Sequence, residues 1–112
     1  MQKKLAVGNW KMNGLYEALP EFSALNTACS APACDVLICP PTTLIRSLVE
    51  ACDGTGIQVG GQDCHEQTSG AHTGDISAHM LVDAGATHVI LGHSERRASY
   101  SESDLRIRAK AT

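Results

Sequence analysis

Two segments of the chain place polar side chains at alternate positions directly after an apolar run. Asn9 and Lys11 follow the first run, and His93 and Glu95 follow the last one. Side chains of an extended strand alternate between its faces, so each pair should point to one side of its strand. A lysine there suits a phosphate or a developing oxyanion. A histidine suits carbonyl polarisation or proton transfer, and a glutamate suits orienting the lysine. Each pair alone also fits ordinary exposed side chains, but the two together favour an active site.

A long polar stretch, residues 62–77, separates the third and fourth apolar runs. It is longer than a compact connection between a strand and a helix requires, which indicates a role in binding or in contact with a partner. Cys64 and three histidines spaced seven residues apart, His65, His72 and His79, leave open a small metal-binding α/β module. The glycines between them argue against one helix that carries all three histidines on the same face.

The composition limits the class of protein. A chain of 112 residues holds at most one domain. Its 43% hydrophobic and 19% charged residues are typical of a globular protein. The net charge of −3 gives no electrostatic reason to expect nucleic acid or a membrane surface as partner. No apolar stretch has the length of a membrane span or a signal peptide, so we expect no membrane association.

Five cysteines are present and none forms a C-x-x-C pair. Several lie inside apolar runs, Cys39 among them, which is typical of buried reduced thiols rather than disulfides or a zinc site. The sequence therefore predicts a cytoplasmic location.

Four short apolar runs predict four strands. They cover residues 5–7, 36–39, 57–59 and 88–91. Each run is too short for a helix and almost continuous in apolarity, as in parallel strands that are covered on both faces.

Helical patterns lie between these runs and after the last one. They cover residues 15–25, 40–52, 77–85 and 101–112. We expect Pro20 in the first turn of its helix and Ser77 as an N-cap. Met80, Leu81 and Ala84 should face inward.

The last predicted helix begins near Ser101, where an acid follows the capping serine by three residues. Its basic residues Arg106, Arg108 and Lys110 lie close to Glu102. We interpret them as a solvated helix face.

The regular alternation of strand and helix predicts an α/β fold with a parallel sheet and right-handed crossovers. Four parallel strands fit either a small open sheet or half of an eight-stranded barrel, and periodicity does not choose between these. In both architectures functional residues gather at the carboxyl ends of the strands.

Three segments in order and at the right spacing resemble the triosephosphate isomerase family. They are residues 8–14 (GNWKMNG), 70–77 (GAHTGDIS) and 91–97 (LGHSERR). The resemblance covers the whole chain but only the N-terminal half of a family member. It implies that residues 1–112 form a single partial domain, roughly the (βα)4 half of a (β/α)8 TIM barrel, which ends within or just after the fourth helix.

The resemblance also implies a reaction, the interconversion of dihydroxyacetone phosphate and glyceraldehyde 3-phosphate through an enediolate, in glycolysis and gluconeogenesis and without a cofactor. Asn9 and Lys11 would contact the triose phosphate. His93 would be the neutral electrophile that polarises the carbonyl. Glu95 would pair with Lys11, and Thr73 would lie at the tip of a loop that contacts a partner subunit.

The general-base glutamate of that family, its lid and its glycine-rich phosphate loop lie on later strand ends. We therefore expect the isolated chain to be a poor isomerase, with activity belonging to the homo-oligomeric enzyme, a dimer in the family. One alternative is a half-barrel with only a structural role, which associates with itself or with the missing half through its sheet edges. The metal-binding module is a weaker alternative.

Overall fold

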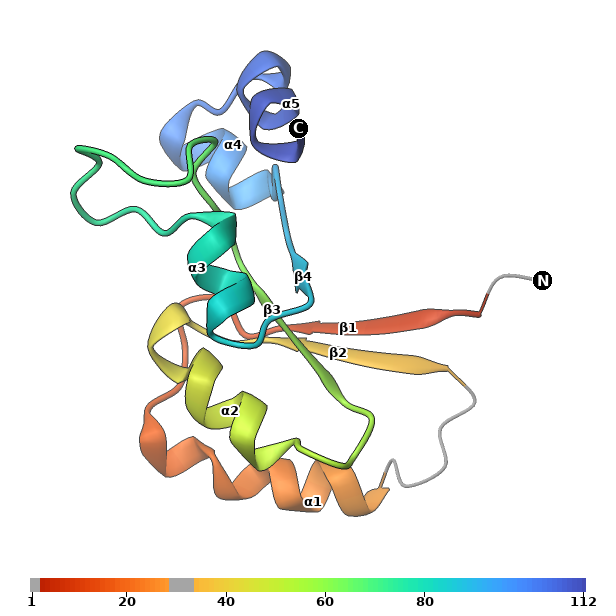
Figure 1. The fold of residues 1–112 in the computed structure, drawn as a ribbon. Helices are drawn as coiled ribbons and strands as arrows, with labels where there is room; N and C mark the ends of the chain where they lie inside the picture. Colours follow the sequence, from red (N-terminus) through yellow and green to blue (C-terminus); the bar gives the residue numbers. More distant parts are fainter. Residues whose placement is uncertain (1–2, 29–33) are drawn as a thin grey trace.

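The computed structural model describes residues 3–28 and 34–112 (Figure 1). Its four strands are β1 (Leu5–Asn9), β2 (Asp35–Cys39), β3 (Gln58–Gly61) and β4 (His88–Val89). They form one sheet in the order β1-β2-β3-β4, and every neighbouring pair is parallel. The prediction of a parallel α/β sheet is therefore confirmed, and the strands lie in the order of the chain.

Helices connect the strands. In chain order they are a 3-10 turn (Tyr16–Ala18), α1 (Pro20–Ala28), a second 3-10 turn (Thr42–Leu44), α2 (Ile45–Ala51), α3 (Ala78–Asp83), α4 (Ser94–Tyr100) and α5 (Asp104–Ala111). Helices α1 and α2 lie side by side below the sheet in the view of Figure 1. Pro20 is the first residue of α1, as expected for a residue without a backbone N–H. The hydroxyl of Ser77 accepts the backbone N–H of Met80 at 3.1 Å and caps α3, which confirms that prediction.

The region after β4 differs from the sequence-based expectation. One helix from Ser101 was predicted, whereas the structure has α4 and then α5. The N-cap of α4 is His93, whose ring nitrogen takes the place of the serine, threonine or carboxylate oxygen that usually marks a helix start. Ser101 adopts a left-handed conformation with φ of 53° and ends α4, and Ser103 caps α5.

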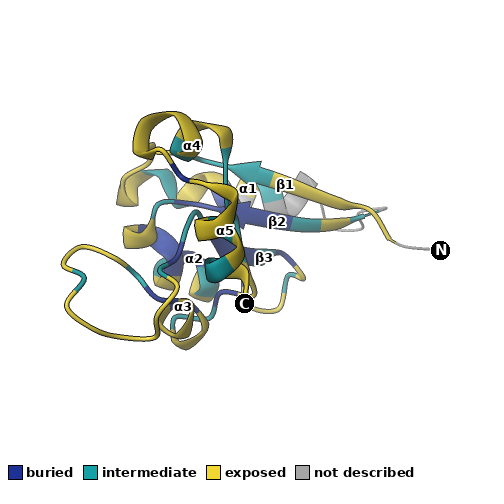
Figure 2. Cartoon of the chain, turned by 90° about the horizontal axis from the view of Figure 1, so that it is seen from above, coloured by how far each residue is buried: buried dark blue, intermediate teal, exposed yellow. Residues whose placement is uncertain are grey.

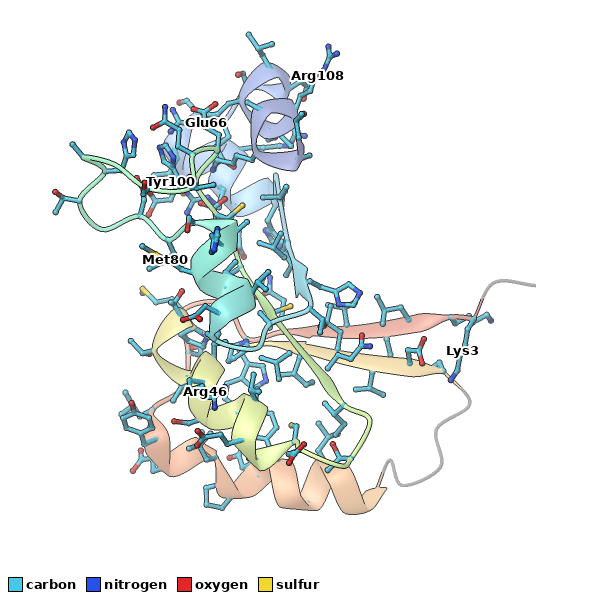
Figure 3. The ribbon with its side chains drawn as sticks, in the orientation of Figure 1. Lys3, Arg46, Glu66, Met80, Tyr100 and Arg108 are labelled. Atoms are coloured by element: carbon cyan, nitrogen blue, oxygen red, sulfur yellow. The ribbon has the colours of Figure 1, made fainter. Side chains whose placement is uncertain are left out.

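Helix α3 packs against the core with a different face from the one predicted. Leu81 is buried, but Met80, predicted to face inward, is exposed (Figure 3). The reason lies in β3, because a Cβ atom added at Gly61 would stand 2.7 Å from Leu81 Cδ1. Leu81 therefore packs directly against the backbone of Gly61, and this contact determines which face of α3 is buried.

The apolar core lies between the sheet and helices α1 to α3. Figure 2 shows it as the buried centre of the molecule, and Leu44, Ile45 and Leu48 are its largest fully buried apolar side chains. The rings of Trp10 and Phe22 stack with centroids 4.8 Å apart, which joins the end of β1 to α1.

The cysteines of the described segments are all free thiols. They are Cys34, Cys39, Cys52 and Cys64, and the last three are buried. The prediction of buried thiols agrees with Cys39, Cys52 and Cys64, whereas Cys34 is half-buried and Cys29 lies outside the described residues. In the described segments no helix is both long and apolar enough to cross a bilayer.

Substitution of Leu48 and of Leu105 tests how much the buried core contributes to the free energy of unfolding. The side chain of Leu48 is fully buried, whereas Leu105 is 76% exposed on α5. Leu48→Ala should lower the free energy of unfolding by about 2–5 kcal/mol, because it removes buried methyl groups and leaves a cavity. Leu105→Ala is the matched control and should change it by less than about 0.5 kcal/mol. Urea denaturation of the two variants measures the difference, and equal effects would contradict the described core.

Candidate active site

The chain leaves β1 in a strained conformation that aims Lys11 at the carboxyl end of the sheet. Lys11 has φ of 56°, in the left-handed region that residues with a side chain rarely adopt. Its backbone N–H donates to Asn9 Oδ1 at 2.8 Å, and Asn13 Nδ2 donates to Trp10 O at 3.0 Å. Hydrogen bonds that involve the side chains of Asn9 and Asn13 therefore stabilise a backbone conformation that is unfavourable for lysine by itself.

Gln62 supports the same turn from the end of β3. Its Nε2 donates to Lys11 O at 2.8 Å and to Cys39 O at 3.0 Å, so one amide group connects the ends of three strands. Sequence reasoning missed this residue. The signal was that Gln62 is the first polar residue after the third apolar run and its glycines, just as Asn9 and His93 are after theirs.

The turn after β4 places His93 and Glu95 together. His93 Nδ1 accepts the backbone N–H of Glu95 at 3.2 Å. A ring nitrogen that accepts a hydrogen bond carries no proton, so the neutral ring has its proton on Nε2. The turn therefore fixes the tautomer of His93 as well as its orientation.

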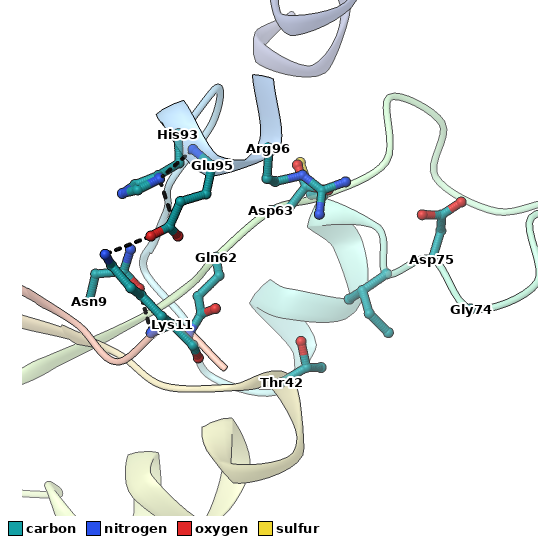
Figure 4. Close-up of a pocket in the computed structure, with 12 residues that line it drawn as sticks. Asn9, Lys11, Thr42, Gln62, Asp63, Gly74, Asp75, His93, Glu95 and Arg96 are labelled. Atoms are coloured by element: carbon teal, nitrogen blue, oxygen red, sulfur yellow. Dashed lines mark hydrogen bonds and ion pairs between the residues drawn. The ribbon is translucent and has the colours of Figure 1, made fainter. Parts of the chain in front are cut away.

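An ion pair joins the two outer strands of the sheet. Lys11 Nζ lies 2.6 Å from Glu95 Oε1 (Figure 4). In a flat four-stranded sheet, β1 and β4 would stand roughly 14 Å apart at about 4.8 Å per strand. The short contact fits strand ends that curl toward one another, as in the wall of a barrel. The hydrogen bond from Lys11 holds the pKa of Glu95 below its ordinary value, and the charge of Lys11 acts in the same direction.

These side chains line one polar cavity of about 280 Å³ at the carboxyl ends of the strands. Asn9, Lys11, Gln62, His93 and Glu95 all border it. The sequence-predicted residues of both strand ends are thus brought together. Ammonium, amide and imidazole donors face the same space, which is the chemistry needed to bind an anionic substrate and to stabilise a developing oxyanion.

A cluster of four charges adjoins this cavity, and two of its members, Asp63 and Arg96, line it. Arg96 Nη2 is 3.1 Å from Asp63 Oδ2, and Lys110 Nζ is 2.9 Å from Asp63 Oδ1 and 2.5 Å from Glu102 Oε2. The side chains of Lys110 and Glu102 are each only 3% exposed. Arg96 follows Glu95 in α4, so the cluster anchors the helix turn that carries the site.

This cluster corrects the interpretation of the basic residues of α5. Arg106 and Arg108 are exposed as predicted, but the side chain of Lys110 is buried and paired. Burial opposes the charge on Lys110, yet its bonds to Glu102 and Asp63 outweigh burial and raise the pKa of the ammonium. Burial likewise opposes the charge on Glu102, yet Lys110 and Arg96 hold the pKa of its carboxyl below the usual range.

Thr73 and the histidines of the long polar loop lie outside the cavity. Thr73 is exposed on this loop, which projects from the body of the molecule between β3 and α3 (Figure 1). Within residues 3–28 and 34–112, no group of three or more His, Cys, Asp or Glu residues could hold a metal ion. The described residues thus give the metal-binding alternative no support.

A parallel sheet with connecting helices, curled at its carboxyl ends around a polar cavity, defines an α/β enzyme domain of the barrel type. Residues 4–112 match the sequence model of triosephosphate isomerase, and the chain belongs to that family. It has the fold of the N-terminal half of the family's TIM barrel. This agrees with the fold class that the sequence predicted.

Individual relatives agree with the family match. The triosephosphate isomerase of Ruegeria pomeroyi is 57% identical over 111 residues, which is 99% of this chain and 44% of the relative. That of Ruegeria sp. (strain TM1040) is 60% identical over 98% of this chain and 44% of the relative. A crystal structure of triosephosphate isomerase from Bartonella henselae superimposes with a TM-score of 0.93 at 49% identity, over 97% of this chain and 46% of that one. The chain thus spans a little under half the length of these relatives.

The pairing of Lys11 with Glu95 has a titration signature. Lys11→Met should raise the pKa of the Glu95 carboxyl toward the ordinary glutamate value, because the hydrogen bond that favours the ionised form is lost. Carbon-detected NMR of the side-chain carboxyl measures this midpoint. Lys3→Met is the control, since Lys3 pairs with Asp35 at the other end of the strands. An unchanged Glu95 midpoint in Lys11→Met would show that the ion pair does not form in solution.

The buried cluster gives stability a defined pH window. The folded-state pKa of Glu102 is lowered, so its contribution is complete above about pH 4.3 and falls as the pH drops through the folded pKa. The pKa of Lys110 is raised, so its contribution is complete below about pH 10.4 and falls as the pH rises through the folded pKa. At pH 7 Lys110→Met should lower the free energy of unfolding by about 3–5 kcal/mol, because a carboxylate is left buried without its main partner.

Two further variants make this prediction specific. Arg108→Met removes an exposed charge from the same helix and should change the free energy of unfolding by less than about 0.5 kcal/mol. Glu102→Leu combined with Lys110→Met should recover part of the loss, since both buried charges are then gone. Denaturation curves for Lys110→Met and Arg108→Met that coincide would contradict the described cluster.

Proposed function

We propose that this chain supplies half of the active site of a triosephosphate isomerase, which interconverts dihydroxyacetone phosphate and glyceraldehyde 3-phosphate through an enediolate. The observation that carries the proposal is the meeting of Lys11, His93 and Glu95 at one polar cavity. Family membership gives the reaction class, and the geometry supports a role for each residue.

Lys11 is proposed to hold negative charge on the substrate. Its ammonium lines the cavity, and its backbone is fixed by Asn9 and Gln62 before any ligand arrives. A charge held in place in advance needs little reorganisation when a phosphate or an oxyanion binds, which is the main source of electrostatic catalysis. Glu95 keeps the ammonium aimed at the cavity, and Asn9 adds an amide that can contact the substrate.

His93 is proposed to polarise the substrate carbonyl. With Nδ1 accepting from the backbone, its Nε2–H is the group available to donate to the carbonyl oxygen. A neutral imidazole in this role is characteristic of the family. As a proton leaves the neighbouring carbon, negative charge moves to that oxygen, and the hydrogen bond from Nε2 strengthens with it.

The group that removes the carbon-bound proton is proposed to lie in the part of the family beyond the match. Three carboxylates border the cavity. Glu95 and Asp63 are engaged in ion pairs with a lysine or an arginine, and Asp75 is exposed on the long polar loop. The bond from Lys11 lowers the pKa of Glu95 and makes this carboxylate a weaker base. In this proposal this chain binds and polarises the substrate, and the general base acts from another strand end.

We also propose a homo-oligomeric assembly and a cytoplasmic location, as for the family. The exposed loop that carries Thr73 offers a contact surface for a partner subunit. The alternative is a half-barrel with only a structural role. The observation in its favour is the exposed strand β1 at the edge of the sheet, where Leu5 and Val7 are 43% and 48% exposed. That edge suits pairing with another strand.

Joining residues 1–112 to the remaining C-terminal part of the Ruegeria pomeroyi relative tests the catalytic proposal. The chimera should show isomerase activity. Lys11→Met should lower its kcat/KM by about 10²–10³-fold, since it removes a preorganised charge at the reacting centre. Coupled assay of both directions of the reaction measures this.

Lys3→Met is the matched control for that experiment, because Lys3 is an exposed lysine far from the cavity. It should keep the activity of the unsubstituted chimera within a factor of two. A folded chimera without activity would favour the structural alternative. A Lys11→Met variant as active as Lys3→Met would contradict the role given to Lys11.

A further inference from the structure

The long polar loop between β3 and α3 has little apolar packing to hold it. Apart from glycines, the only apolar residue between Glu66 and Asp75 is Ala71. His72 is half-buried, and the other residues of this stretch are exposed. Figure 3 shows Glu66 near the base of this projecting segment. Its conformation must therefore depend on hydrogen bonds and on the rings within it.

Two imidazoles form the centre of the loop. The rings of His65 and His72 stack with centroids 3.9 Å apart and planes inclined by 24°. The backbone joins the same region, since His65 N donates to Ile76 O at 2.8 Å and Asp75 N donates to His72 O at 2.9 Å. The stacked pair thus connects the outgoing and returning halves of the loop.

Gln67 sets which ring nitrogen of each histidine carries the proton in the neutral pair. Its backbone N–H donates to His65 Nδ1 at 3.0 Å, so this nitrogen carries no proton. Its side-chain Oε1 lies 2.7 Å from His72 Nε2, which must donate there because an amide oxygen only accepts. A proton added to His65 Nδ1 would face the N–H of Gln67, whereas a proton added to His72 Nδ1 would leave its bond to Gln67 intact.

The groups around His65 carry charges of both signs. Glu66 and Asp75 lie on the loop, Glu102 precedes α5, and Tyr100 lies on α4. The cations that line the same cavities as His65 are Arg96, Arg106 and Lys110. The acids favour an imidazolium and the cations oppose it. In the described structure Nδ1 faces the backbone N–H of Gln67, and a protonated Nδ1 would lose that hydrogen bond, which makes it the deciding contact.

We propose that His65 is a pH-sensitive latch of this loop. With His65 neutral, Nδ1 accepts from Gln67, the two rings stack, and the loop holds its described shape. Protonation of His65 turns the acceptor into a donor, removes the bond to Gln67 and places a cation against the ring of His72. The loop then opens while the sheet stays folded.

NMR of the isotope-labelled 112-residue chain between pH 8 and pH 5 tests this latch. Protection of the Gln67 and Asp75 amides against solvent exchange, corrected for the intrinsic rate, should fall at least fivefold as the pH decreases. The amide of Trp10, which donates to Cys39 O within the sheet region, should keep its protection. That second readout separates loop opening from acid unfolding.

Three variants assign the effect to one nitrogen. His65→Phe keeps an aromatic ring for stacking but has no acceptor, so the pH step at Asp75 should disappear. His72→Phe keeps the His65 acceptor and should retain the step. His79→Gln changes an exposed histidine on α3 and should behave as the unsubstituted chain. Protection of Gln67 that does not change with pH in the unsubstituted chain overturns the proposal, as does a step that persists in His65→Phe.

Discussion

The pairing of parallel strands is the constraint on which the site depends. Parallel registry brings the carboxyl ends of β1 to β4 to one edge, and each strand there passes from apolar to polar residues within a few positions. The curl of the sheet then brings the outer strands close enough for Lys11 to reach Glu95. Gln62 binds the carbonyls of Lys11 and Cys39 and so keeps the strand ends aligned. Without the curl, the chain would carry the same residues but no shared cavity.

Much of the architecture was accessible from sequence because short-range rules govern it. Continuous apolar runs gave the strands, Ser77 marked a cap, and the proline in α1 fell where its missing N–H costs nothing. Each of these inferences needs only residues that are neighbours in the chain. Asn9 and Lys11 do share the cavity, but the left-handed turn after β1, rather than alternation along a strand, places Lys11 there.

The features that were missed depend on residues distant in sequence. Lys110 was interpreted as solvated because α5 alone cannot show that Asp63, 47 positions earlier, lies against it. Met80 was placed inside because its helix periodicity permits it, but the bare surface at Gly61 decided in favour of Leu81. Helix α4 was overlooked since a histidine ring rarely serves as the capping acceptor. In each case a tertiary contact, or an unusual hydrogen-bond acceptor, outweighed the local pattern.

The left-handed backbone of Lys11 has a consequence for how this site can change over evolutionary time. A residue with φ of 56° loses backbone stability when its side chain is branched at Cβ, whatever chemistry that side chain could offer. Valine, isoleucine and threonine are thus disfavoured there by local geometry before selection on function acts. The accessible replacements are mainly glycine, asparagine, aspartate and unbranched side chains. The backbone conformation at Lys11 therefore restricts which amino acids can replace this residue during evolution.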